Sequence, residues 1–105
     1  MRKITADAIR AFRNGTKFKR GNTQVFIEKN RDKQILHSSR ILTLFGYVIA
    51  EMDSNGHLWI SSAGWKTVTT KERLNGFPSV HIYQHKFEWY LNGQLWNGRR
   101  IKVEW

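Results

Sequence analysis

The stretch ILTLFGYVIAEMDSNGHLWISS, residues 41–62, decides the fold predicted for this chain. Its first part, 41–52, is the longest strand candidate and has apolar residues at both odd and even positions. A strand that is apolar on both faces is usually central in its sheet and covered on both sides. Gly46 inside this segment indicates a bulge or a close backbone approach. The turn sequence 53–56 and the apolar run 57–62 then predict a second strand that returns antiparallel to the first.

Upstream of this stretch, residues 5–13 predict a short amphipathic helix. Thr5 is the expected N-cap, because its hydroxyl can accept hydrogen bonds from amides of the first turn. Gly15 suits the left-handed residue that commonly ends a helix. Residues 16–29 predict a hairpin around Gly21-Asn22. The expected core face of the helix consists of Ala8, Ile9 and Phe12.

Downstream, residues 70–75 predict a second short helix that begins with a capping box of Thr69 and Glu72. Asn92-Gly93 and Asn97-Gly98 are both typical of tight hairpin turns. The remaining strand candidates are residues 79–84, 86–91 and 100–105. Two sets of side chains share strand parity and are expected in the core, namely Phe87, Trp89 and Leu91, and Ile101, Val103 and Trp105.

These elements predict an α+β fold in a single domain, residues 1–105. We expect a mainly antiparallel, strongly twisted sheet of about six to eight short strands with two short helices. The domain is expected to combine a basic helix and hairpin, residues 1–40, with an aromatic-rich β scaffold, residues 41–105.

The composition argues against an enzyme and against a bound metal or cofactor. The chain has no Cys, which excludes disulfides, thiolate zinc sites and cysteine nucleophiles. If one extended strand ran through His81 and His85, the two residues would be about 13 Å apart and could not share one metal ion. No nucleophile elbow or phosphate-binding glycine loop is present. We therefore predict no catalytic residues, no metal site and no cofactor. No apolar segment approaches the ~20 residues that span a bilayer, so we expect no membrane partner.

The basic charge is concentrated near the N-terminus. Lys and Arg number 18 against 8 acidic residues, a formal net charge of +10, and residues 1–40 hold a net +8 of it. Such a cluster can neutralise phosphates and release counterions whatever the base sequence. Exposed aromatic rings of a sheet can in addition stack on unpaired bases. The candidate nucleic-acid-binding residues are Arg10, Arg13, Lys17, Lys19, Arg20, Arg31, Arg40, Tyr83 and Tyr90.

Two segments of the chain resemble a known family. They are GHLWISSAGWKTVTTKERLNGF, residues 56–77, and EWYLNGQLWNG, residues 88–98. They are similar to ISxAGW…TTKERLN and WYLNG…W segments in a family of small proteins of tailed bacteriophages, over about residues 41–98. The family carries no assigned activity, so the resemblance implies no functional residue. It implies an accessory protein that acts in the cytoplasm of an infected bacterium.

Three functions fit these observations. The first is non-enzymatic binding of nucleic acid, single-stranded or by shape, through the N-terminal Lys/Arg cluster. The second is inhibition of an acidic host or anti-phage defence protein by protein–protein contact. The third is sequestration of an anionic nucleotide between the subunits of a homo-oligomer. A minor component of the virion is a further possibility.

Overall fold

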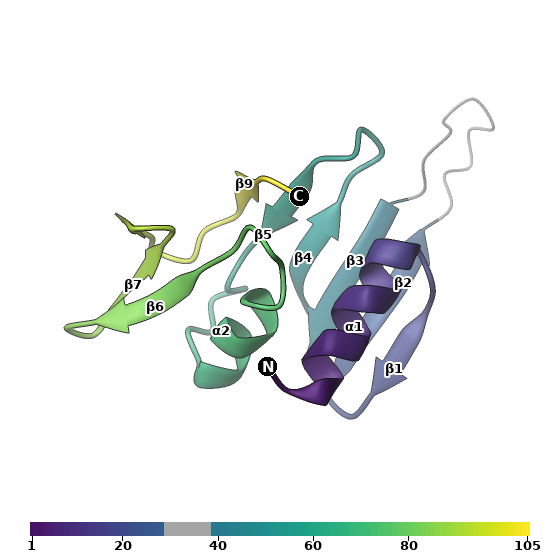
Figure 1. Cartoon of the computed structure of the whole chain (residues 1–105), viewed down its shortest axis with the longest axis horizontal. Coiled ribbons are helices and arrows are strands. Elements are labelled where there is room, and N and C mark those ends of the chain that lie inside the picture. The colour runs from purple at the N-terminus through teal and green to yellow at the C-terminus, as the bar shows by residue number, and fades with distance from the viewer. Residues whose placement is uncertain (29–38) are drawn as a thin grey trace.

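The computed structural model describes residues 1–28 and 39–105 (Figure 1). The first helix, α1, spans Lys3–Asn14 and is longer than predicted. Thr5 is not its N-cap: Arg2 occupies that position without a side-chain cap, and Thr5 is buried inside the helix. The predicted end is confirmed, because Gly15 adopts the left-handed conformation with φ of 69°. The predicted core face is also confirmed, since Ala8, Ile9 and Phe12 are all buried.

The larger sheet has six antiparallel strands in the order β1-β2-β3-β4-β5-β9. Its strands are β1 Phe18–Arg20, β2 Thr23–Glu28, β3 Ser39–Leu44, β4 Tyr47–Met52, β5 Leu58–Ile60 and β9 Ile101–Val103. The predicted hairpin around Gly21-Asn22 is confirmed by the pairing of β1 with β2. The predicted return strand is confirmed by the pairing of β4 with β5.

The prediction of one strand over residues 41–52 is wrong. The chain reverses at Phe45-Gly46, where φ is 51° and 82°, and β3 and β4 pair as a hairpin. Positive φ at both central residues defines the tight turn that matches the twist of the flanking strands. Gly46 is thus a turn residue, and the register shift in this hairpin lies at Leu42/Thr43 instead. Residues 41–52 have apolar side chains at both odd and even positions because they form two strands and an exposed turn.

A second sheet of three antiparallel strands comprises β6 Ile82–His85, β7 Glu88–Leu91 and β8 Gln94–Leu95. The turn at Asn92-Gly93 is confirmed, with φ of 51° and 89° between β7 and β8. The turn predicted at Asn97-Gly98 is wrong, because this segment carries the chain from the small sheet to β9 in the large one. The α+β class is confirmed, and the described residues place nine strands in two sheets rather than in one.

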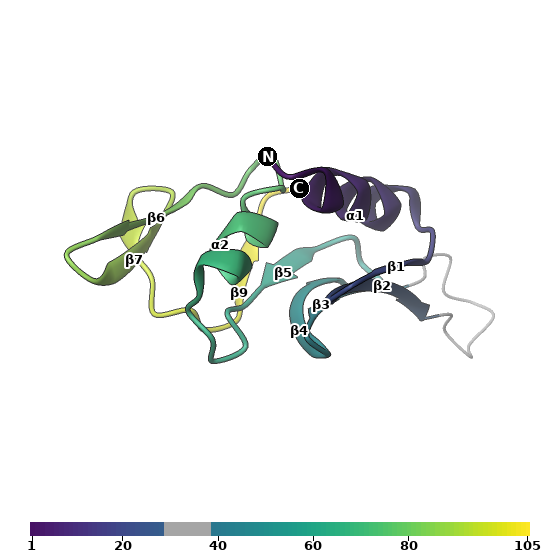
Figure 2. The same cartoon turned by 90° about the horizontal axis from the view of Figure 1, so that it is seen from below.

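The second helix, α2, spans Val68–Leu74 and contacts both β4 and β6. Its N-cap is Thr67, whose hydroxyl accepts a hydrogen bond from the Thr70 amide, so the predicted capping box at Thr69 is wrong. α1 lies on one face of β1, β2 and β3 (Figure 2). One hydrophobic cluster contains buried side chains of both helices and both sheets.

The core prediction for the C-terminal strands is partly correct. Trp89 and Leu91 are buried, but Phe87 is 95% exposed because it occupies the turn between β6 and β7 and not a strand. Ile101 and Trp105 are about two-fifths exposed. The Trp105 ring nevertheless packs against Phe12 and Phe77, with centroid distances of 5.7 and 5.8 Å.

A buried arginine joins the N-terminal third to the rest of the molecule. Arg73 of α2 is only 2% exposed, and its guanidinium donates to the hydroxyls of Thr5 and Thr23, each at 3.0 Å. Glu72 accepts hydrogen bonds from both Arg73 and Thr5. The buried cation is therefore paired and hydrogen-bonded, as burial of a charge requires. Glu72 thus acts in tertiary contacts and not in a capping box.

Candidate nucleic-acid interface

Two of the predicted basic residues lie on either side of one acid. The Asp7 carboxylate is 2.8 Å from the guanidinium of Arg20 and 3.8 Å from that of Arg10. The hydrogen bond from Arg20 holds the pKa of Asp7 below its ordinary value. Arg20 is thus tied to α1, whereas the side chain of Arg10 is 71% exposed and only loosely paired. Arg10 is the better placed of the two to contact a ligand.

Arg13 and Arg40 meet at the end of α1 but have different environments. Arg13 is exposed, and its guanidinium lies over the Trp105 ring, 5.5 Å from the centroid. Arg40 instead donates from Nη1 to the Arg13 carbonyl at 2.8 Å and satisfies a carbonyl of the last helical turn. Its Nε is buried without a partner in the part of the chain that the structure describes. Arg40 is half-buried and supports the fold.

Lys17 and Lys19 lie on a different surface from the helical arginines. Lys19 pairs with Gln24, and Gln24 is next to the buried Val25 in β2. Because adjacent residues of a strand point to opposite faces of the sheet, the side chain of Lys19 lies on the face turned away from α1. Both lysines border a shallow hollow with Phe26 on that face. Arg31 lies outside the described residues. Among the residues that the structure describes, the predicted basic side chains therefore do not form one patch.

The two predicted tyrosines are brought together on the small sheet. Tyr83 of β6 pairs directly with Tyr90 of β7, and their rings stack at 5.4 Å with an interplanar angle of 9°. His81 lies 5.4 Å from the Tyr83 ring, and His85 lies 6.4 Å from the Tyr90 ring. We call these four side chains the ring ladder. Tyr83 and both histidines are exposed, while Tyr90 is half-buried.

The ring ladder is connected to the arginines of α1 by a short segment of chain. Arg10, Arg13, Gly76 and Pro78 border a common shallow groove of about 270 Å³. His81 follows Pro78 by three residues, which span at most about 10 Å. The exposed arginines of α1 and the first ring of the ladder are therefore within reach of one short oligomeric ligand.

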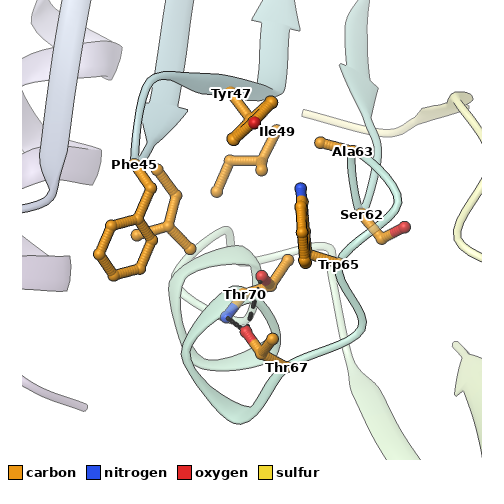
Figure 3. A pocket seen from close by; sticks show the side chains of 9 residues that line it. Phe45, Tyr47, Ile49, Ser62, Ala63, Trp65, Thr67 and Thr70 are labelled. Atoms are coloured by element: carbon orange, nitrogen blue, oxygen red, sulfur yellow. Dashed lines mark hydrogen bonds between the residues drawn. The ribbon is translucent and has the colours of Figure 1, made fainter.

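A third surface feature was missed by the sequence prediction. A cavity of about 400 Å³ is lined by the aromatic side chains of Phe45, Tyr47 and Trp65, among others (Figure 3). The turn Phe45-Gly46 forms one wall, and that turn was interpreted as the interior of a strand. The segment 62–65, of the ISSAGW motif, forms the opposite wall. A Phe-Gly pair is not a common hairpin-turn sequence, and for this reason the pattern gave no signal.

Comparison with protein families places the chain among phage proteins. Residues 1–104 match the family described as Kyanoviridae Gp96 protein, and the chain belongs to this family. The match includes the basic N-terminal part, which the resemblance seen in residues 41–98 did not cover. No curated protein and no solved structure matches the chain.

Within residues 1–28 and 39–105, no three His, Asp or Glu side chains converge as metal ligands would. In the same ranges, neither helix is long and apolar enough to cross a bilayer.

Proposed function

We propose that this phage protein binds single-stranded nucleic acid without catalysis, in the cytoplasm of the infected bacterium. The ring ladder of His81, Tyr83, Tyr90 and His85 carries the proposal, because it is a continuous and largely exposed aromatic surface. Arg10 and Arg13, which border a groove with Pro78, three residues before His81, supply the positive charge. The family assignment supports the phage context of this proposal.

The ladder suits bases because every base has a π-face, so stacking tolerates any sequence. Tyr83 and Tyr90 are already stacked within the protein, and a base placed on the exposed ring would continue that stack. Base–aromatic stacking contributes about 1–3 kcal/mol per base. A duplex keeps its bases paired and stacked on each other, so the ladder favours single strands over double strands.

The arginines suit the phosphates of the same strand. Arg10 is held at 3.8 Å from Asp7, and can rotate toward a phosphate more easily than the hydrogen-bonded Arg20. Arg13 lies over the Trp105 ring and keeps its N–H donors at its edge. Two or three phosphate contacts predict about a tenfold loss of affinity when salt rises from about 50 to about 200 mM.

Fluorescence anisotropy with labelled oligo(dT), oligo(U) and a duplex hairpin of equal length tests the proposal. We expect both single strands to bind more tightly than the duplex and to dissociate as salt is raised. Replacing both Tyr83 and Tyr90 with Ala should weaken single-strand binding by about 10- to 100-fold. Absence of binding to every probe at about 25 mM salt would refute nucleic-acid binding.

A matched pair of charge reversals tests the position of the interface. Arg10→Glu with Arg13→Glu, and Lys17→Glu with Lys19→Glu, change the net charge equally on different surfaces. We expect the first pair to abolish binding and the second to have only a small effect. Equal losses would show that net charge alone drives binding and that the proposed surface is misplaced.

A further inference from the structure

The cavity at the β3–β4 turn is built to receive an apolar group. It lies between that turn, the segment before Thr67 and the start of α2, and in Figure 3 Phe45 and Trp65 lie on opposite sides of the hollow. The hydroxyls of Ser62, Thr67 and Thr70 at its border are already engaged. Thr67 Oγ1 accepts from the Thr70 amide at 3.1 Å and contacts Thr70 Oγ1 at 3.0 Å. Ser62 Oγ accepts from the Gly64 amide at 3.2 Å. The remaining lining is apolar and aromatic, so an apolar occupant fits better than a polar one.

Two residues of the cavity wall have backbone conformations that their side chains disfavour. Phe45 and Ala63 have φ of 51° and 55°, a region in which Gly, Asn and Asp are the usual residues. Phe45 is in addition 69% exposed, so its ring gains little from burial within the chain. A bulky apolar residue at such a position points to a role for the side chain outside the folding of the monomer.

A bulky apolar side chain also has a positive φ at the tip of the β6–β7 hairpin. Phe87 has φ of 68° and is 95% exposed, the most exposed of the large apolar side chains in the part of the chain that the structure describes. Figures 1 and 2 show that this hairpin projects from the end of the molecule. Phe87 is therefore an apolar side chain presented on a projecting turn.

We propose that Phe87 of one copy of this chain inserts into the Phe45–Tyr47–Trp65 cavity of a second copy. The β6–β7 hairpin projects away from α2 and from the β3–β4 turn, which border the cavity, so the proposed contact is between two molecules (Figure 1). The cavity of about 400 Å³ has room for a phenyl ring. The three aromatic rings around it offer the edge and face contacts that a phenylalanine prefers. Phe45 and Phe87, two exposed phenylalanines in left-handed conformations, thereby take part in the same intermolecular contact.

Sedimentation velocity from low micromolar to several hundred micromolar protein tests the contact. We expect the wild type to associate as concentration rises, into a closed dimer or a head-to-tail assembly. Phe87→Asn and Trp65→Ala should each weaken association by at least about 30-fold. Phe87→Asn should not lower the thermal midpoint, because Asn tolerates positive φ. Phe26→Ala, which removes an exposed ring elsewhere, is the control and should associate like the wild type.

A mixing experiment gives the sharper test. The Phe87→Asn chain keeps an intact cavity, and the Trp65→Ala chain keeps an intact Phe87. Each alone should stay monomeric, and the mixture should form a one-to-one complex through the single remaining contact. A wild type that is monomeric throughout, association that neither variant reduces, or a mixture that does not associate would each overturn the proposal. The first two outcomes would leave the oligonucleotide result unaffected, so the two proposals fail independently.

Discussion

The two sheets use their side chains in opposite ways. Around the large sheet, three arginines are engaged in the fold: Arg20 pairs with Asp7, Arg40 bonds the end of α1, and Arg73 of α2 is buried against the hydroxyls of Thr5 and Thr23. On the small sheet, Tyr83 and Tyr90 contact chiefly each other and their neighbouring histidines. The density of charge in a sequence therefore does not locate a working surface, because much of that charge can serve the fold.

The difference also separates stability from binding. Groups that hold the elements together lie where α1, α2 and the large sheet meet, while the exposed rings lie on or next to the β6–β7 hairpin at one end of the molecule (Figure 1). Substitutions at the meeting point should lower stability, and substitutions on the ladder should mainly alter binding.

Arg73→Ala should produce the largest loss of stability. The change leaves the Glu72 carboxylate without its cation and removes hydrogen bonds to Thr5 and Thr23. Breaking a buried ion pair from one side costs about 3–5 kcal/mol. Chemical denaturation measures the change in the free energy of unfolding. The control Lys71→Ala, on the same helix, should alter it by no more than about 0.5 kcal/mol. A loss below about 1 kcal/mol for Arg73→Ala would contradict its structural role.

Gly76→Ala should have the next largest effect. A Cβ at this position would lie 2.7 Å from both Ile9 Cγ1 and Thr5 Cγ2, and 3.0 Å from the Arg73 carbonyl. Overpacking of this kind costs about 1–3 kcal/mol. Gly76 is not among the glycines with positive φ, so the added methyl acts through these contacts, and thermal unfolding should show a midpoint below that of the wild type. A midpoint equal to that of the wild type would show that α1 shifts without cost.

The Tyr83–Tyr90 pair should contribute modestly to stability. A double-mutant cycle with Ala at each position should give a coupling free energy of about 0.5–1.5 kcal/mol, the range for stacked aromatic pairs. The double variant should still unfold cooperatively, because neither ring is part of the buried core. A coupling above about 3 kcal/mol would mean that the ladder is a structural element like the Arg73 network.

The smallest expected effect concerns acid pH. Hydrogen bonds from Arg20 to Asp7, and chiefly from the Trp59 indole to Asp53, lower the pKa of each carboxyl in the folded protein. A carboxyl with a lowered pKa stabilises the fold above its unfolded pKa of about 4, and this stabilisation is lost as pH falls through the folded value.

Asp7→Asn and Asp53→Asn should each reduce the loss of stability seen on acidification below about pH 4. High salt should weaken the Asp7 contribution, which depends on an exposed ion pair, more than the Asp53 contribution, which rests chiefly on neutral N–H donors. Thermal midpoints between about pH 2 and pH 6 at two salt concentrations measure both effects. An identical salt response of the two variants would contradict this assignment.

Local signals predicted much of the secondary structure. Gly15, Gly21-Asn22 and Asn92-Gly93 marked their turns correctly, because residues that tolerate positive φ are needed there in any context. Turn residues did not predict the turns at Phe45-Gly46 and Lys86-Phe87, because three of these four residues are poor turn formers. Both failures adjoin the surfaces proposed for self-association, as expected where side-chain function overrides local preference.

The candidate site was predictable only in part. Tyr83 and Tyr90 were both among the predicted residues, and the structure brings them together with His81 and His85 on one face of the small sheet, since side chains alternate across a strand. The alternation of side chains along a strand could not show that Arg40 donates a hydrogen bond to the last turn of α1. It also could not show that Lys19 lies on the sheet face opposite to the one that α1 covers. Those positions depend on which strands pair and on which face the helix covers.

The sequence by itself determined the class of the fold, the amphipathic face of α1 and most of the turns, since each depends on periodicity or on a few adjacent residues. Only the tertiary structure decided that nine strands divide between two sheets, that Arg73 is an interior residue and that the basic cluster separates onto different faces. These features depend on contacts between residues far apart in the chain, such as Thr5 with Glu72, and no local pattern encodes them.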